Sequence, residues 1–256
     1  MKKYFLCLFI VCFSLLGEGI DSYTDLYLNG ENFIDQSTYH RSVSTYGNTQ
    51  VVNNIYQFGN GSYRFDGTGD FVYYNIGTVT YPYTVDFWLR VSSYNSYNTF
   101  WGVESKNMLQ IQGQKIILSS GTSSVTHRSN TTINLNTWYH LGLVMTSQTS
   151  GSLFINGQKE TLNFNSSSTG GYGTQGLPTT GNMFFGTYDG WTEYGLNGYI
   201  DEIRVSKGIA RWDSNFVVPG VSYQNPVPEP CSLILSCIGL LLYFRKYFLF
   251  SKKGKI

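Results

Sequence analysis

Apolar and polar residues alternate along several short segments of the chain, a pattern typical of β-strands that bury one face. The clearest segment is Tyr83–Val91. Trp88 lies on one face of this predicted strand, and the other face is an apolar stripe of Tyr83, Val85, Phe87, Leu89 and Val91. The same reasoning predicts strands at 62–66, 71–74, 100–103, 108–112, 115–119, 138–146, 152–155, 158–164 and 182–186. No helix-period pattern of useful length lies between the terminal segments, so the pattern predicts an all-β fold.

Turn signals separate these predicted strands. Gly67–Asp70 lies between two aromatic runs and predicts a hairpin that joins the strands at 62–66 and 71–74. Asn156–Gly157 is a type I′ turn signal and predicts a second hairpin, with its return strand at 158–164. A loop rich in Gly, Ser and Thr follows at 165–180, and loops of this length in a compact domain are often functional.

The last predicted strand opens at Gly198 and carries one carboxylate on an apolar face. Strict alternation places Asp201 on the same face as Tyr199, Ile203 and Val205, with Ile200, Glu202 and Arg204 on the other face. A carboxylate among apolar neighbours needs hydrogen bonds or a cation. Lys207–Gly208 is a turn signal, after which Ile209–Trp212 is predicted to fold back as a short apolar cap.

Both ends of the chain look like export signals. Residues 1–19 have Lys2 and Lys3, an apolar run and two small residues near a cleavage point, which predicts a secretory signal helix; the alternative is a membrane anchor. A linker at 223–230 ends in Pro228, Glu229 and Pro230, and 231–256 begins as an apolar helix followed by a basic cluster. This tail resembles the PEP-CTERM sorting signal, which implies processing by an exosortase-type membrane protease in a Gram-negative bacterium. Its alternative is an ordinary tail anchor.

The middle of the chain, 20–222, is predicted to be an acidic, tyrosine-rich domain from its composition and charge. Aromatic residues make up 17% of the chain, with 21 tyrosines, and charged residues only 13%. Ile20–Pro230 holds 10 of the 17 basic and 15 of the 16 acidic residues, a balance of −5, which argues against nucleic-acid binding. The four cysteines, Cys7, Cys12, Cys231 and Cys237, all lie in the terminal segments, so the domain is expected to fold without disulfides.

Several of these segments resemble motifs of laminin G-like, concanavalin A-like domains. The sequence Gly-Tyr-Ile-Asp-Glu-Ile-Arg-Val at 198–205 resembles their closing strand, and Lys-Gly-Ile-Ala-Arg-Trp at 207–212 resembles the segment that follows it in one branch. Similar matches occur at 65–72, 83–89, 138–144 and 153–158, in the order expected for the family. The resemblance implies a two-sheet antiparallel β-sandwich of the concanavalin A-like jelly-roll kind.

Signs of catalysis are weak in this sequence. Glucanases with this fold need two or three carboxylates at alternate positions of one strand, and the chain has no such triplet. Asp86 has no carboxylate two residues away, and Asp201 and Glu202 are adjacent. His140 shares a face with Trp138 and is interpreted as structural. We therefore expect no enzyme activity, with a glycoside hydrolase as the least favoured reading.

Binding residues are expected in loops. Sugars stack their C–H faces on exposed aromatic rings, and six loop residues qualify: Tyr94, Tyr97, Tyr172, Tyr188, Trp191 and Tyr194. The resemblance also implies one structural calcium ion, because many relatives hold one near a sheet edge. Calcium prefers several oxygen ligands, and its candidate carboxylates are Asp66, Asp70 and Asp201. The alternatives are backbone hydrogen bonds for Asp201 and turn formation for the other two.

Together these observations predict an exported, non-catalytic binding module at the cell envelope or in the extracellular matrix. Its expected partners are an extracellular polysaccharide or glycoprotein as ligand, the export translocon and an exosortase. The alternative is a structural or adhesive matrix protein that contacts other surface proteins. The ligand class rests on resemblance, because a fold alone does not fix a function.

Overall fold

The computed structural model describes residues 19–95, 97–103, 107–120, 123–147, 150–160, 163–164, 181–188 and 193–223. In these ranges the chain forms strands, turns and loops, and the part from Ser22 to Tyr223 is one compact unit. The described ranges contain no helix with the length and apolar character needed to span a membrane. The predicted signal helix, linker, Pro228-Glu229-Pro230 motif and C-terminal helix lie outside them.

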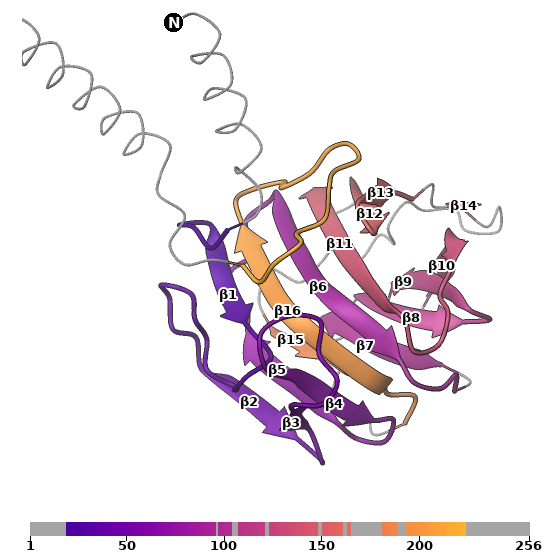
Figure 1. The fold of residues 1–256 in the computed structure, drawn as a ribbon. Helices are drawn as coiled ribbons and strands as arrows, with labels where there is room; N and C mark the ends of the chain where they lie inside the picture. The colour runs from indigo at the N-terminus through magenta and orange to yellow at the C-terminus, as the bar shows by residue number, and fades with distance from the viewer. Residues whose placement is uncertain are drawn as a thin grey trace, which may run out of the picture. The chain divides into compact units, whose positions relative to one another are not determined.

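Two antiparallel sheets make up this unit, and they lie one behind the other in Figure 1. The first sheet has the order β13 (Gln158–Lys159), β12 (Ser150–Ile155), β11 (Trp138–Ser147), β6 (Tyr83–Val91), β16 (Asn197–Lys207), β4 (Ser62–Asp66), β3 (Gln50–Val52), with β1 (Thr24–Leu28) also paired to β16. The second has the order β14 (Asn163–Phe164), β10 (Ser123–Thr132), β9 (Lys115–Ser120), β8 (Asn107–Gln112), β7 (Asn98–Val103), β15 (Asn182–Phe185), β5 (Phe71–Asn75), β2 (Val43–Tyr46). The predicted all-β, two-sheet antiparallel sandwich is confirmed.

The core lies between the sheets. The apolar stripe predicted for β6 is buried there, and Trp88 lies on the opposite face, as expected. From the second sheet, alternate residues such as Val72, Met183 and Phe185 face the same core. Alternation therefore divides most strands into one face in the core and one face that points away from it.

β16 is the strand around which the first sheet is organised. It pairs with β6 on one side, and on the other with β4 along its first half and β1 along its second half. The predicted faces are correct for Ile203 and Val205, which share the core face, but wrong for Tyr199 and Ile200, because a bulge between Asp201 and Arg204 shifts the register. Glu202 adopts a left-handed φ of 53°, so Ile200, Ile203 and Val205 all face the core, whereas Tyr199 does not.

The predicted hairpin at Gly67–Asp70 is also wrong. β4 belongs to the first sheet and β5 to the second, so the turn carries the chain from one sheet to the other. Asp70 is buried there, and its carboxylate accepts hydrogen bonds from the backbone N–H groups of Asp66 (2.7 Å) and Asn48 (2.5 Å). The local turn signal was real, but buried tertiary contacts decide which strands pair.

Two further strand predictions need correction. The hairpin at Asn156–Gly157 is present, but its predicted return strand at 158–164 divides into β13, which stays in the first sheet, and β14, which pairs with β10 of the second. β10 itself was not predicted: its polar sequence, Ser-Ser-Val-Thr-His-Arg-Ser-Asn-Thr-Thr, lacks the apolar alternation of a half-buried strand. The strands before residue 60, β1, β2 and β3, could not be placed from the sequence.

Candidate functional site: a loop rim at one end of the sandwich

Three connections meet at one end of the sandwich, and we call this region the rim: the β4–β5 turn, the β6–β7 loop and the loop before β16. The backbone N–H of Thr99, near the start of β7, donates to the carbonyl of Tyr194 (2.8 Å), which joins the end of the β6–β7 loop to the loop before β16. The N–H of Ser92 donates to the carbonyl of Asn197 (2.9 Å). At Gly67, in the β4–β5 turn, an added Cβ would lie 3.1 Å from the Asn95 amide nitrogen, so this turn packs closely against the β6–β7 loop.

Two of the predicted binding tyrosines meet at the rim. The rings of Tyr97 and Tyr194 have centroids 5.3 Å apart and an interplanar angle of 90°, an edge-to-face contact. Both remain exposed, at 38% and 41% respectively. Tyr194 has a left-handed φ of 66°, and the hydrogen bond from Thr99 to its carbonyl holds this conformation. The pair is therefore a fixed aromatic surface that is open to solvent.

The connections that form the rim also carry polar side chains. Thr68, Asn95 and Glu193 are exposed, and Asp66 is partly exposed. One carboxylate oxygen of Asp66 accepts the N–H of Thr68 (2.9 Å), which orders the turn. Hydroxyl, amide and carboxylate groups beside a flat ring are the donors and acceptors that a sugar needs for orientation.

The other predicted binding residues are placed differently. Tyr188 is buried, with 7% exposed, and packs on Gly102, where an added Cβ would lie 2.6 Å from its ring, so the expectation of an exposed ring is wrong. Tyr94 is half-buried, and its hydroxyl donates to the carbonyl of Ile133. Tyr172 and Trp191 lie outside the described residues.

The three predicted calcium carboxylates do not come together. Asn197 pairs with Asp66, and Asp201 lies four residues further along β16, about 13 Å away at the usual strand rise. Among the residues that the structure describes, no three or more His, Cys, Asp or Glu side chains form a group able to hold a metal ion. The calcium ion stays a prediction from the sequence.

Asp201 is buried and accepts backbone hydrogen bonds. This agrees with the alternative to calcium binding that the sequence analysis gave for this carboxylate. Its carboxylate accepts the N–H groups of Gln57 (2.9 Å), Phe58 (3.1 Å) and Glu202 (2.8 Å). It thereby fixes both the bulge of β16 and the loop before β4, where Phe58 packs edge-to-face on Trp88. Burial raises the pKa of Asp201 to about 7, although the backbone N–H donors act in the opposite direction.

This raised pKa predicts a pH-dependent stability. Between its ordinary value and about 7, the folded state holds a proton on Asp201 that the unfolded state releases, so stability falls as the pH rises through this window. Because one pKa unit corresponds to about 1.4 kcal/mol and the pKa of Asp201 is raised from 3.8 to about 7, we expect a loss of roughly 3 kcal/mol between pH 4 and pH 7. The measurement is urea unfolding of the wild type and Asp201→Asn at several pH values. Parallel curves for the two proteins would contradict the assignment.

A second group of polar and ionisable residues is buried on the outer face of the first sheet, and we call it the outer-face cluster: Asp86, His140, Glu202, Arg204 and Tyr223. Arg204 donates to both oxygens of Asp86, from Nε (3.0 Å) and Nη2 (3.2 Å). Asp86 also accepts the Tyr223 hydroxyl and lies 3.4 Å from His140 Nε2. Burial alone would raise the pKa of Asp86, but the charge of Arg204 and the hydrogen bond from His140 lower it to about 2.

A segment after β16, residues 208–223, covers this cluster, and we call it the strap. Trp212 and Phe216 stack with centroids 4.0 Å apart, and each meets His140 edge-to-face. At its end, Ser222 donates to Glu202 (2.6 Å) and the N–H of Tyr223 donates to the same carboxylate (3.1 Å). The predicted apolar cap is therefore part of a longer cover, and the two carboxylates beneath it are fully committed to protein partners.

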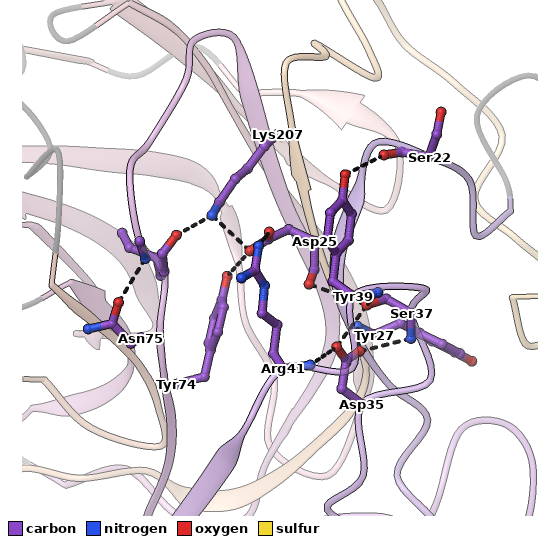
Figure 2. Close-up of polar contacts among 12 residues, drawn as sticks. Ser22, Asp25, Tyr27, Asp35, Ser37, Tyr39, Arg41, Tyr74, Asn75 and Lys207 are labelled. Carbon is purple, nitrogen blue, oxygen red and sulfur yellow. Dashed lines mark hydrogen bonds and ion pairs between the residues drawn. The ribbon is translucent and has the colours of Figure 1, made fainter.

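Figure 2 shows a third polar cluster, which joins the two sheets near β1. Asp25 pairs with Lys207 of β16 (2.9 Å) and with Arg41, and the hydroxyl of Tyr74 from β5 donates to it (3.4 Å). Beside it, Asp35 accepts the N–H groups of Tyr27 (2.8 Å) and Arg41 (2.7 Å). These contacts hold the loop between β1 and β2 in place, so the cluster is structural.

The comparisons with known proteins agree on the fold. A family model described as Laminin_G_3, concanavalin A-like lectin/glucanases superfamily, matches residues 66–211. A search of curated proteins finds no match. Among solved structures, the chain resembles the binding domain of botulinum neurotoxin DC in complex with SialylT, with a TM-score of 0.52 and 15% identity over 74% of this chain and 49% of that one.

Two further solved structures come from glycan-processing proteins. Domain 4 of AbnA, a GH43 extracellular arabinanase from Geobacillus stearothermophilus in complex with arabinotriose, matches with a TM-score of 0.50 and 16% identity over 75% of this chain and 94% of that one. A Trypanosoma rangeli sialidase mutant with trans-sialidase activity matches with a TM-score of 0.53 and 13% identity over 72% and 31%. The chain spans about half the length of the first neurotoxin structures, and identities this low show the fold alone.

Proposed function

The chain belongs to the Laminin_G_3 family of the concanavalin A-like lectin/glucanase superfamily, and on this premise we propose that it is an exported glycan-binding module whose ligand contacts the rim. Among the similar structures, a neurotoxin binding domain is in complex with SialylT, and an arabinanase domain is in complex with arabinotriose. These neighbours support a glycan as the class of ligand proposed for this chain. The geometry of the rim supports the proposed binding site.

The observation that carries the proposal is the exposed pair Tyr97 and Tyr194. An exposed aromatic side chain normally loses rotamer freedom when it binds, which weakens affinity. Here the edge-to-face contact and the backbone hydrogen bond between Thr99 and Tyr194 restrict both rings before any ligand arrives. Fixed rings with amide and hydroxyl groups at Asn95 and Thr68 suit a sugar, which presents an apolar face and a ring of hydroxyls.

The proposed module binds without cleaving its ligand. Glycoside hydrolysis needs two carboxyl groups on either side of a bond that the substrate can reach. Asp86 and Glu202, on the outer face of the first sheet, are buried beneath the strap and fully engaged by Arg204, Tyr27 and residues 222–223. These contacts support a structural role for both carboxylates.

The proposal includes export through the translocon and delivery to the envelope or matrix, because the ends of the sequence carry the predicted signal and sorting segments. Processing of the tail by an exosortase-type protease is part of the same proposal. Mass spectrometry of the mature protein tests it: an N-terminus after the signal segment and a C-terminus near the Pro-Glu-Pro motif are expected. A chain recovered intact from the cytosol would contradict it.

Binding is tested with full-length protein in detergent on an array of neutral and acidic polysaccharides. We expect the wild type to bind at least one glycan, and Tyr97→Ala and Tyr194→Ala to weaken that binding about tenfold each, or about 1.4 kcal/mol. Tyr56→Ala is the matched control, since Tyr56 is also exposed, at 43%, but lies outside the rim. An equal effect of all three substitutions, or no binding by the wild type, would reject the proposal.

A further inference from the structure

A column of stacked aromatic rings stands on the outer face of the second sheet, and we call it the aromatic column: Tyr46, Phe71, Tyr73 and Phe184. These residues come from three adjacent strands, β2, β5 and β15. Their neighbours in sequence, such as Val72, Met183 and Phe185, belong to the core, so alternation directs the column away from the core. The hydrophobic core therefore does not account for its burial.

The geometry of the column fixes its outermost ring. Tyr46 stacks on Phe71 with centroids 4.9 Å apart and an interplanar angle of 14°. Phe71 meets Phe184 edge-to-face (5.6 Å), and Phe184 stacks on Tyr73 (5.7 Å, 22°). Phe71 and Phe184 are each only 6% exposed, whereas Tyr46 is 55% exposed on the edge strand β2. One face of the Tyr46 ring is thus supported from behind, and the ring is still largely open to solvent.

This exposed ring belongs to the same end of the molecule as the rim. β2 ends at Tyr46, and the N–H of Asn48 just beyond it donates to Asp70, in the β4–β5 turn of the rim. In the second sheet β7, β15, β5 and β2 are consecutive neighbours. Three strand spacings give about 14 Å between β2 and β7, at whose start Tyr97 lies. A ligand that touches both places has to be longer than one sugar ring.

The charge of this surface indicates whether the polysaccharide ligand is neutral or acidic. β2, β5 and β15 have the sequences Val-Ser-Thr-Tyr, Phe-Val-Tyr-Tyr-Asn and Asn-Met-Phe-Phe, without any charged residue. Among the described residues of the rim, the exposed or partly exposed charged side chains, Asp66 and Glu193, are acidic, and residues 20–230 have a balance of −5. A polyanion would be repelled by such a surface, while an uncharged chain with many hydroxyls would not.

We propose that Tyr46 is a second aromatic contact of this protein, and that with the rim pair it binds a neutral polysaccharide along its chain. The inference rests on the proposed glycan binding and adds the length and charge of the ligand. Two contacts on one chain act together, because the first binding event raises the effective concentration for the second. Affinity then depends on ligand length, and the contribution of Tyr46 is seen only with long chains.

The test compares ligand lengths with full-length Tyr46→Ala, Tyr97→Ala and Tyr56→Ala. The probes are neutral glucan, mannan, galactan and arabinan, each as polymer and trisaccharide, and the acidic polymers polygalacturonate and alginate. Wild type is expected to bind a neutral polymer more tightly than its trisaccharide and than either acidic polymer. Tyr46→Ala should weaken polymer binding about tenfold and leave trisaccharide binding unchanged. Tyr97→Ala should weaken both, and Tyr56→Ala neither.

The outcomes separate this inference from the proposed function. If Tyr97→Ala loses glycan binding while Tyr46→Ala binds the polymer like wild type, the second contact is wrong and the rim site stands. A stronger affinity for the acidic polymers would likewise reject the neutral ligand alone. No binding of any probe by the wild type would reject both. A melting temperature of Tyr46→Ala equal to that of Tyr56→Ala excludes unfolding as the cause, and Tyr46→Phe, which keeps the ring, should retain polymer binding.

Discussion

Arg204→Met should lower the free energy of unfolding by about 3–5 kcal/mol, because it leaves Asp86 buried without its charged partner. Asp86 and Arg204 are both 0% exposed, and two hydrogen bonds join them at 3.0 Å and 3.2 Å. Met fills a similar volume, so the change removes mainly the charge and the donors. Chemical unfolding monitored by fluorescence measures the loss.

Arg90→Met is the matched control for this change. Arg90 lies on β6 and is half-buried, and its guanidinium stands 5.4 Å from the ring centre of Tyr199 rather than beside a buried carboxylate. Its replacement should cost less than about 1 kcal/mol. The double variant Asp86→Leu with Arg204→Met should regain part of the loss, since neither charge is then left alone. If Arg204→Met costs no more than Arg90→Met, the pair does not stabilise the fold as described.

Tyr223→Phe probes the same cluster at its link to the strap. It removes one hydrogen bond to Asp86 and keeps the ring over Arg204, whose guanidinium carbon lies 3.9 Å from the ring centre. The strap thus ends on the same ion pair that joins β6 to β16. Damage to the pair is therefore expected to loosen residues 208–223 together with the sheet, which faster proteolysis within the strap would reveal.

The strands with regular alternation were predictable from the sequence, and the physical reason is their one-sided burial. β4 and β6 have the predicted bounds, Ser62–Asp66 and Tyr83–Val91. β10 lacks an apolar stripe, so periodicity gave no signal there. Strand pairing was harder to predict from the sequence. The aromatic runs on either side of Gly67–Asp70 suggested one hairpin, but they form strands of opposite sheets. A local pattern does not distinguish two strands that pair from two strands that face each other across the core.

The bulge in β16 shows a second limit. Strict alternation assumes that successive side chains always point to opposite faces of the sheet. The left-handed φ of Glu202 breaks this rule, because it forms a β-bulge, which inserts an extra residue into the strand. The sequence did indicate a problem at this point, since Asp201 among apolar residues needed partners. Backbone N–H groups of residues 57 and 58, far away in sequence, supply them, and no pattern within the strand reveals such partners.

The sequence predicted the residue type of the candidate site, tyrosines in loops, but not which of these residues come together. The sequence identified tyrosines in loops, and two of them, Tyr97 and Tyr194, meet at the rim. Tyr188 was assigned to the same surface but is buried against Gly102, because a glycine on the neighbouring strand leaves room for a ring. Tyr46 was not singled out. Its stacking partner Phe71 lies across a strand pair between β2 and β5, a pairing that the sequence analysis could not place.

Gly198, the second residue of β16, is the site of the second substitution with a large expected effect. Gly198 lies in β16 between β4 and β6, paired with Phe65 on one side and Val91 on the other. An added Cβ would overlap the carbonyl oxygen of Arg90 and lie 3.1 Å from Cα of Val91. Backbone atoms in the middle of a sheet cannot move aside without breaking ladder hydrogen bonds. The motif begins with glycine because the neighbouring strand approaches too closely for any side chain.

Gly198→Val should therefore destabilise the fold by about 3 kcal/mol or more, because the overlap is with backbone and not with a flexible side chain. In a domain of this size, that corresponds to a fall in melting temperature of roughly 6–12 °C. Gly220→Val is the control, because a Cβ at Gly220 has no atom within 4 Å, and it should melt within about 2 °C of the wild type. Gly198→Ala should lie between them. If Gly198→Val melts like Gly220→Val, then β6 and β16 can separate at this point without cost, and the close approach is not what fixes the first residue of the motif.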